Sequence, residues 1–464
     1  MAQRPAADSR LTWLTLGLLI VALLLRVARI GESLWYDEIA LWLTYGQAGA
    51  DTIVTRYFDP VNHIAHSLVT WLSVQGLESA MGFPLALRLP ALLFSLLSVP
   101  LMLGLALRGF PLRVAAIAAL LVAVLPVTVF EGVEARGYSM MIALTLASTW
   151  MLLVARDSGR PLHWLAYAVL AALAVWTHLV AACVFAGHAL WLTWRDRHVR
   201  ALGGVALAAA LTMLLYAPVL PDVIDQFTGN FQRTSADQPT LLGAEGLKTL
   251  LQFGGAWTWW AALPGLALVA LGFVQLRHER DRARRDALAL LWLGWPVALI
   301  AVLIAGTWVY ARFTLFVVPA AALTMALGVE MLWRWRWPLG AVALALVVGV
   351  GSFHVLTRGP KQPVREAMLF VHEQRRPHEP VLAVGIAHHV TRMYAGDAPV
   401  RFSPMHGRDL PQQLADAPPR WIVVLYPGHL LPDAAVALHA HGYERTRTFD
   451  GWNDWGDIEV WRIR

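Results

Sequence analysis

Charge is scarce in this sequence, and lysine is nearly missing. Only 15% of the 464 residues are charged, against about a quarter in average soluble domains. Lysine occurs only at Lys248 and Lys361, so the net charge of +6 comes almost entirely from arginine. The arginines lie between long apolar runs, where they act as topology signals. This distribution excludes nucleic acid as a partner.

Cysteine is equally rare. Cys183 is the only one in the chain, which excludes a disulfide bond within it. The opening segment "MAQRPAADSR" leads into an apolar run that lacks a small-residue cleavage site behind a short hydrophobic region. We therefore expect the first span to be retained and not removed as a signal peptide.

Apolar residues make up most of the chain. Hydrophobic residues account for 58% of it, and 22 of them are tryptophans, which are enriched at membrane interfaces. Apolar runs recur over the first three quarters of the sequence, and a helix of about 20 residues crosses the hydrocarbon of a bilayer. The composition thus predicts an α-helical polytopic membrane protein.

We expect about eleven transmembrane helices. They begin near Leu11, Ala86, Val114, Tyr138, Trp164, Val180, Ala201, Ala261, Ala287, Phe313 and Pro338. The fifth and sixth look short, with a break around His178.

Six basic segments alternate with less basic loops. They are "MAQRPAADSR", "RGFPLR" (108–113), "RDSGRPLH" (156–163), "RDRHVR" (195–200), "RHERDRARRD" (277–286) and "RWRW" (334–337). The first precedes the first span and each of the others follows an even-numbered span. The positive-inside rule therefore places the N-terminus and all six segments in the cytoplasm, with the inner (plasma) membrane as the location.

The chain divides into two predicted domains. Residues 1–357 form the transmembrane domain, whose first outer loop spans 31–85. From 358 to 464 the sequence is more polar, and short apolar runs such as "RWIVVLY" alternate with helix-like pieces such as "VREAMLFVHEQRR". This alternation predicts a small extracytoplasmic α/β domain.

Two adjacent acids follow the first span in "SLWYDEIALWL" (33–43). Asp37 and Glu38 stand among apolar and aromatic residues that suit the membrane surface. The alternative is a hydrated interfacial acid pair. Partial desolvation favours a base role for an acid, and ionisable residues at this depth are functional candidates. Helical neighbours point about 100° apart, so only one acid can face a given site. We predict Asp37 as the catalytic residue, with Glu38 as its support.

The same loop contains "DPVNHIAHSLV" (59–69). His63 and His66, three residues apart, share a helix face. They suit either a metal site or, with better odds, a surface helix with polar contacts. Asp59 and Asn62 are hydrogen-bonding candidates beside the same water-facing cavity.

Arginines mark three other span ends. Arg136, beside Glu134 in "EARGYSMM", is either a snorkelling anchor or a cation that faces the cavity. Arg312, beside Tyr310 in "VYARFTLFVVP", suits an anionic headgroup because guanidinium binds phosphate bidentately.

Arg88 opens the second span, where it can also meet phosphate. His178, within the membrane between two short spans, is either a packed polar residue or part of the cavity wall. With Asp59, Asn62, His63 and Glu134 it completes the candidate substrate cavity.

An acid and several arginines at the outer ends of spans suit one reaction. A carboxylate can take the proton of an acceptor hydroxyl, and arginines can hold a departing lipid phosphate. If a divalent cation takes part, Asp37 and Glu38 are its expected ligands.

Several stretches together resemble the GT-C class of membrane glycosyltransferases. They are "SLWYDEIALWL", "DPVNHIAHSLV", "LALRLPALLFSLLSVPLML", "EARGYSMMIALTLAS" and "YARFTLFVVPAAALTMALGV", over roughly the first 330 residues. The sequence is most similar to the bacterial branch of protein O-mannosyltransferases and of lipid A aminoarabinose and galacturonic acid transferases.

The resemblance implies a polyprenyl-phosphate-linked sugar donor, an extracytoplasmic site and inverting transfer of a hexosyl or pentosyl group. The family's catalytic acid falls on Asp37, and its donor-phosphate arginines fall on Arg136 and Arg312. The acceptor is a glycan, a lipid or a protein, and other membrane lipids are further partners.

Two other functions remain open from the sequence. A transporter or flippase of lipid-linked saccharides would also place arginines at span mouths, but it predicts charges and broken helices near the midplane. A structural or assembly protein would give Asp37 no special role.

Overall fold

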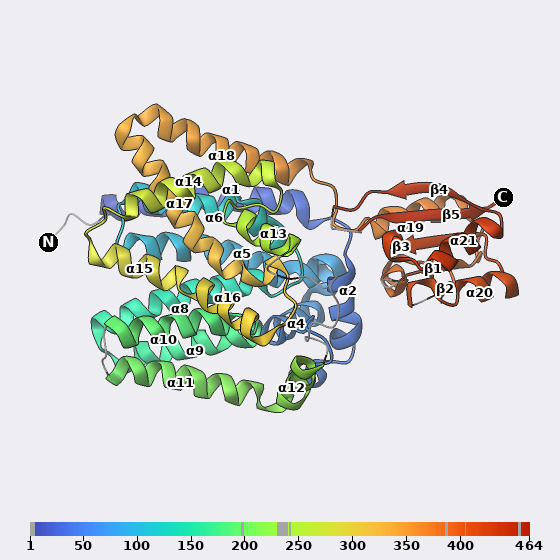
Figure 1. The fold of residues 1–464 in the computed structure, drawn as a ribbon, viewed down its shortest axis with the longest axis horizontal. Helices are drawn as coiled ribbons and strands as arrows, with labels where there is room; N and C mark the ends of the chain where they lie inside the picture. The colour runs from blue at the N-terminus through green and yellow to red at the C-terminus, as the bar shows by residue number, and fades with distance from the viewer. Residues whose placement is uncertain are drawn as a thin grey trace. The chain divides into compact units, whose positions relative to one another are not determined.

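The computed structural model describes residues 5–195, 199–229, 240, 243–385, 388–403, 405–452 and 456–464. The chain forms two compact units (Figure 1). We call Met1–Ile30 with Ala48–Leu356 the helical unit, and Gly31–Gln47 with Thr357–Arg464 the tail unit.

The helical unit is built from the apolar runs. Its helices are α1 (Pro5–Ile30), α3 (Ala50–Thr55), α4 (Ile64–Met81), α5 (Phe83–Leu107), α6 (Leu112–Val124), α7 (Pro126–Glu131), α8 (Tyr138–Ser158), α9 (Pro161–Thr177), α10 (Ala181–Arg195), α11 (Val199–Tyr216), η2 (Ala217–Val219), α12 (Leu220–Thr228), α13 (Ala244–Gln252), α14 (Trp259–Leu276), α15 (Arg282–Trp292), α16 (Gly294–Ala305), η3 (Ala311–Val317), α17 (Val318–Trp335) and α18 (Trp337–Thr357).

Eight stretches of helix within the described residues are long and apolar enough to cross a membrane, and α6 and α9 are shorter apolar helices. Every predicted span start lies inside a helix or one residue before it. The predicted break at His178 is confirmed, because α9 ends at Thr177 and His178 is extended. The helical, multi-pass membrane architecture is thus confirmed.

A basic end of the helical unit is held together by ion pairs. The buried carboxylate of Asp286 lies 3.4 Å from Arg156, 3.4 Å from Arg195 and 3.9 Å from Arg282. Three of the predicted basic segments therefore meet around one acid, although the segment 195–200 lies partly outside the described residues.

The remaining arginine-rich segments join the same end. Glu330 accepts from Arg113 at 2.7 Å and from Arg334 at 2.8 Å, and Arg284 donates to the Gly109 carbonyl at 2.8 Å. Every basic segment after the first one thus belongs to one linked set, as the positive-inside argument requires.

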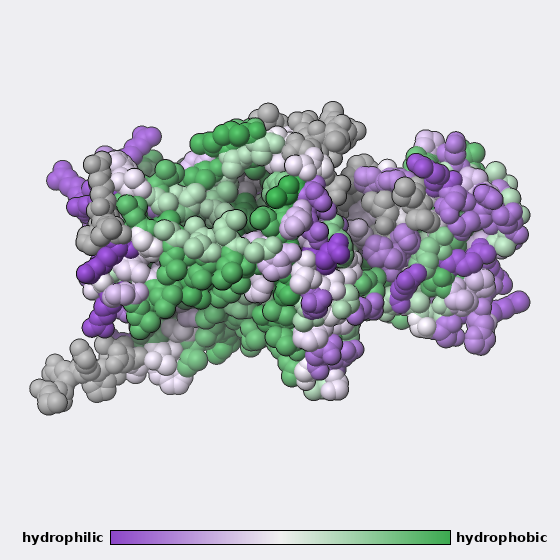
Figure 2. Space-filling view, turned by 90° about the horizontal axis from the view of Figure 1, so that it is seen from below, coloured by the Kyte–Doolittle hydropathy of each residue, from purple (hydrophilic) through white to green (hydrophobic). Residues whose placement is uncertain are grey.

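Two long helices run from this basic end to the opposite end. α8 carries Arg156 in its last turn and begins at Tyr138, and α17 carries Arg334 in its last turn. At 1.5 Å per residue, helices of this length separate the two ends by about 30 Å, one bilayer core. Figure 2 shows the broad apolar surface of the helical unit, coloured green.

The tail unit contains a five-stranded sheet in the order β2-β1-β3-β5-β4. The strands are β1 (Val381–Val384), β2 (Val400–Ser403), β3 (Trp421–Leu425), β4 (Tyr443–Phe449) and β5 (Ile458–Ile463). β1 is parallel to β2 and β3, whereas β5 is antiparallel to β3 and β4.

Helices accompany this sheet, as the alternating pattern predicts. They are α2 (Tyr36–Leu41), η1 (Trp42–Gly46), α19 (Val364–Gln374), η4 (His388–Tyr394), η5 (Met405–Gly407), α20 (Leu410–Asp416), η6 (Pro427–His429) and α21 (Pro432–Ala440). β1 and β3 are buried along their whole length, which is typical of strands that are covered on both faces. The predicted α/β character of the tail is confirmed.

Candidate functional site

Two arginines meet at one tyrosine, at the end of the helical unit opposite the basic end. The Arg312 Nε donates to the hydroxyl of Tyr138 at 3.2 Å. The Arg136 guanidinium lies 5.7 Å from the centre of the same ring. Arg136 is buried, and Glu131 also acts on the Tyr138 hydroxyl through its charge. Two guanidinium groups held this close in an apolar setting favour an anionic ligand.

Histidines complete this cluster. The ring of His63 lies 5.0 Å from that of Tyr138 and 4.7 Å from that of His178. His178 also lies 5.4 Å from Phe313. The structure therefore places His178 with the span ends and not halfway along a span, and it brings four of the predicted residues together: His63, Arg136, His178 and Arg312. We call these four residues with Tyr138 the arginine cluster.

The backbone of Gly137 fixes the orientation of His63. The Gly137 N–H donates to His63 Nδ1 at 2.8 Å. A Cβ at Gly137 would lie 2.5 Å from that nitrogen, so only glycine fits at this position. Because Nδ1 accepts, the proton of the neutral ring is on Nε2. The Nε2 atom is buried and has no hydrogen-bond partner among the described residues.

These histidines are neutral at ordinary pH. Burial, and then the positive charge of Arg136, lowers the pKa of His63 well below its usual value. The same two causes lower the pKa of His66 and of His178 to about 3. The cluster thus offers an N–H donor beside two permanent cations, which suits an anion.

The position of Arg312 is set by η3 and its contacts. The Ala311 N–H donates to Glu245 Oε2 at 2.7 Å, and Lys248 lies 2.9 Å from the other oxygen of Glu245. The Arg312 guanidinium lies 4.2 Å from the ring centre of Tyr310. Tyr310 therefore orients the guanidinium through a cation–π contact.

Some predicted residues have local partners instead. Asn62 donates to the carbonyls of Ile53 at 2.9 Å and Arg56 at 3.1 Å, and Asp59 accepts from the Val61 N–H at 2.8 Å. These bonds shape the loop that leads to His63.

Glu134 and Arg88 also take part in backbone hydrogen bonds. The Glu134 carbonyl accepts from the Arg136 N–H at 2.7 Å, in the turn that presents the arginine. Arg88 is buried and donates to the Ile30 carbonyl at 2.8 Å. This contact satisfies a carbonyl at the end of α1 that has no partner within the helix.

The acid pair lies on α2, in the tail unit. Glu38 is buried, and its Oε2 accepts from the Trp35 N–H at 3.2 Å, so that it caps the start of its own helix. Asp37 is also buried and occupies the first turn, where a carboxylate suits the helix dipole.

Side chains from residues 361–394 hold the segment 34–36, which leads into α2. The Leu34 N–H donates to the Tyr394 hydroxyl at 2.7 Å, and the Tyr36 N–H donates to Gln362 Oε1 at 3.0 Å. The ammonium of Lys361 lies 4.1 Å from the ring centre of Trp35. The residues around Asp37 thus depend on side chains more than 300 positions away in the sequence.

Among the described residues, no group of three or more His, Cys, Asp or Glu is placed to hold a metal ion. His66 faces Thr70, whose hydroxyl lies 3.4 Å from its Nδ1. The metal role that the sequence allowed for Asp37 and Glu38 stays a prediction.

Comparison with known proteins identifies the fold. Residues 68–221 match the family described as dolichyl-phosphate-mannose-protein mannosyltransferase. The structure is similar to that of ArnT from Cupriavidus metallidurans, both in the apo state and bound to undecaprenyl phosphate. The sequence identity is 15%, the TM-score is 0.58, and the match covers 99% of each chain. The chain has the GT-C glycosyltransferase fold.

Two further GT-C structures agree. The oligosaccharyltransferase AglB from Archaeoglobus fulgidus, in complex with an inhibitory peptide and a dolichol-phosphate, is 11% identical with a TM-score of 0.53, over 89% of this chain and 69% of that one. The arabinofuranosyltransferase AftD from Mycobacteria is 14% identical with a TM-score of 0.55. The match covers 97% of this chain and 41% of AftD. No curated protein sequence matches the chain. The predicted resemblance to the GT-C class is confirmed.

Proposed function

We propose that this GT-C protein transfers a sugar from a polyprenyl-phosphate-linked donor to an acceptor hydroxyl, with inversion, at the outer face of the cytoplasmic membrane. The observation that carries the proposal is the arginine cluster, about one bilayer core away from the basic end. Similar folds in ArnT and AglB were found with undecaprenyl phosphate and dolichol-phosphate.

The arginine cluster would hold the donor phosphate. Arg136 and Arg312 supply fixed positive charge, and the buried His63 Nε2–H supplies a further donor. A cluster at the end of the spans leaves the polyprenyl chain in hydrocarbon while its phosphate reaches the guanidinium groups. As the bond between the sugar C1 and the phosphate oxygen breaks, negative charge grows on the phosphate, and these donors stabilise it.

Asp37 would act on the acceptor. Its carboxylate takes the proton of the acceptor hydroxyl while that oxygen forms the new bond to C1, from the side opposite the departing phosphate. Glu38 supports it by capping α2. The base role of Asp37 rests on the sequence and on the resemblance, and the acceptor is a glycan, a lipid or a protein.

Membranes that contain each variant and a radiolabelled polyprenyl-phosphate sugar test these roles. Asp37→Asn should reduce sugar transfer by about 10² to 10⁴, the usual contribution of a general base. Arg312→Gln should weaken donor binding and raise KM, whereas Arg160→Gln, an exposed arginine near the basic end, should change neither quantity.

Expression and thermal unfolding of every variant must match those of the wild type. Unchanged transfer by Asp37→Asn would remove Asp37 from the mechanism. Movement of the labelled lipid between leaflets without any transfer would instead favour the flippase function.

A further inference from the structure

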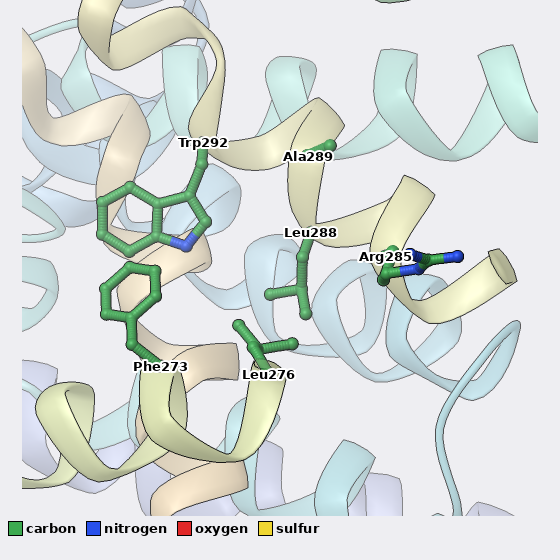
Figure 3. A pocket seen from close by; sticks show the side chains of 6 residues that line it. All are labelled: Phe273, Leu276, Arg285, Leu288, Ala289 and Trp292. Atoms are coloured by element: carbon green, nitrogen blue, oxygen red, sulfur yellow. The ribbon is translucent and has the colours of Figure 1, made fainter. Parts of the chain in front are cut away.

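A pocket of about 230 Å³ lies between α14 and α15, near the basic end of the helical unit (Figure 3). It is lined by Phe273, Leu276, Arg285, Leu288, Ala289 and Trp292. One cationic side chain therefore borders an otherwise apolar space, a combination that suits an amphipathic ligand.

The apolar part of the pocket has a fixed wall. Trp292 donates through its indole N–H to the Thr324 hydroxyl at 3.0 Å, and its ring lies 5.4 Å from that of Phe273. Phe273 is 43% exposed, so this wall is open to the hydrocarbon around α14. In Figure 3, Leu276 and Leu288 lie between this aromatic pair and Arg285.

The acidic residues near Arg285 pair with other arginines, so the guanidinium of Arg285 can bind an anion from outside the protein. The stretch 277–286 contains five arginines and three acids. Glu279 lies 3.0 Å and Asp281 lies 3.8 Å from Arg284, and Asp286 is shared by the three arginines described above. Among the described residues, the Arg285 guanidinium makes no ion pair or hydrogen bond to a side chain.

We infer that this pocket binds an anionic glycerophospholipid, with an acyl chain along Phe273, Leu276 and Leu288 and the headgroup phosphate at Arg285. Basic pockets between transmembrane helices on the cytoplasmic side are typical sites for acidic lipid headgroups. The site lies at the end of the spans opposite the arginine cluster, so it is separate from the proposed donor site and holds a lipid that is not consumed.

The local fold places Arg285 at the level of a headgroup. Asp281 caps α15, since its carboxylate accepts from the Ala283 and Arg284 N–H groups. The cap begins the helix four residues before Arg285. The guanidinium therefore lies in the first turns of a span whose later residues enter hydrocarbon, at the depth where a phosphate and its chain separate.

Native mass spectrometry of the full-length protein can test the site. The protein is released from nanodiscs that contain equal amounts of phosphatidylglycerol and phosphatidylcholine. The wild type should retain phosphatidylglycerol preferentially. Arg285→Gln should lower that retention about fivefold, because this is the change in affinity for anionic lipid that one basic residue near a membrane surface typically contributes. Arg280→Gln, which removes an exposed arginine of the same stretch, should leave it unchanged.

A second variant tests the apolar part. Ala289→Phe fills the pocket without touching any charge, and it should also reduce phosphatidylglycerol retention while the unfolding temperature stays near that of the wild type. Soluble glycerol phosphate should fail to compete, because it lacks an acyl chain. Equal retention of both lipids, or equal retention by Arg285→Gln and Arg280→Gln, would overturn the inference. Sugar transfer is not the readout, so these results are independent of the proposed function.

Discussion

Gly137 controls how closely the connection between α7 and α8 approaches His63. Any side chain here would displace the imidazole, because a Cβ would lie 2.8 Å from the His63 Cβ and 2.9 Å from a methyl group of Thr177. The residue follows Arg136 directly, so a shift here also moves a guanidinium of the arginine cluster.

We therefore expect Gly137→Ala to lower sugar transfer by between about tenfold and a hundredfold, as misplacement of a site by an ångström typically does. The assay compares it with Gly76→Ala, where an added Cβ meets nothing within 4 Å. Equal activity of the two variants would show that His63 is not part of the site.

A buried histidine makes stability depend on pH. The pKa of His66 is lowered from 6.5 to about 3. The unfolded chain binds this proton below pH 6.5 and the folded chain does not, so the free energy of unfolding falls as the pH drops from about 6.5 towards 3. Between pH 7 and pH 5 we expect this residue to remove up to about 2 kcal/mol.

Chemical unfolding in detergent at the two pH values measures this effect. His66→Gln should show a smaller loss of stability on acidification than the wild type, whatever its stability at pH 7. Identical pH dependence of the two proteins would mean that folding does not change the pKa of His66.

Single residues differ in how well the sequence predicts their roles. The sequence marked Arg136 and Arg312 as candidates because each is a cation at the outer end of a span, and the structure brings both to Tyr138, while their role towards a phosphate stays a prediction. Glu245 could not be predicted, since nothing in "GAEGLKTL" shows that its carboxylate will meet the N–H of Ala311, 66 positions away. Lys248, which pairs with Glu245, is one of only two lysines in the chain. This rarity was the one feature of the sequence that could have drawn attention to the segment.

At the level of elements, Arg26 joins three helices. It is fully buried on α1 and donates to the Ala123 carbonyl at 2.8 Å and to Ser95 Oγ at 2.7 Å. Ala123 is near the end of α6, and its carbonyl lacks the usual donor four residues on, because the Val127 N–H donates to the Gly255 carbonyl at 3.1 Å instead. In a membrane protein a backbone carbonyl freed in this way must find a partner from another helix.

Arg26→Gln should consequently lower the free energy of unfolding by roughly 2–3 kcal/mol, the cost of leaving buried acceptors unpaired. Arg10→Gln, on an exposed part of the same helix, serves as the control. Thermal unfolding in detergent measures both, and an equal effect of the two changes would contradict the structural role of Arg26.

Helix starts were predictable because apolar runs must be about one bilayer long. The irregular elements were not. η1 is a π-helix, and the Trp42 ring lies so close to Gly46 that a Cβ there would come within 2.2 Å of it. η3 contains Thr314 with φ −97° and ψ 16°, and the Gln252 side chain donates to its hydroxyl at 2.6 Å. The geometry of η3 depends on a partner 62 positions away in the sequence, whereas the close contact in η1 joins residues four apart that no apolar pattern marks.

At the scale of the whole molecule, residues 31–47 belong with the tail although they follow the first span. Arg365 donates to the Gly31 carbonyl at 2.7 Å through its side chain and to Ser33 Oγ at 3.1 Å through its backbone N–H. Gln362 is buried and accepts from the Tyr36 N–H. The tail therefore supports the segment that carries Asp37.

Gln362→Ala should lower sugar transfer about tenfold or more, because α2 loses the bond that holds its first residue. Gln412→Ala, an exposed change in the same unit, should have no effect. The measurement is transfer at saturating donor, with expression and the unfolding temperature as checks. Full activity of Gln362→Ala would show that the tail does not position Asp37.

The sequence by itself determined the membrane architecture and the common end of the basic segments, because these follow from apolar length and charge distribution, and its motifs carried the resemblance to the GT-C class. Only the tertiary structure decided that Arg136, Arg312, His63 and His178 share one tyrosine, and that the segment around Asp37 is bound to the tail. Both results depend on contacts between residues far apart in the chain. Periodicity and composition describe single segments, so they contain no information about which segments will meet.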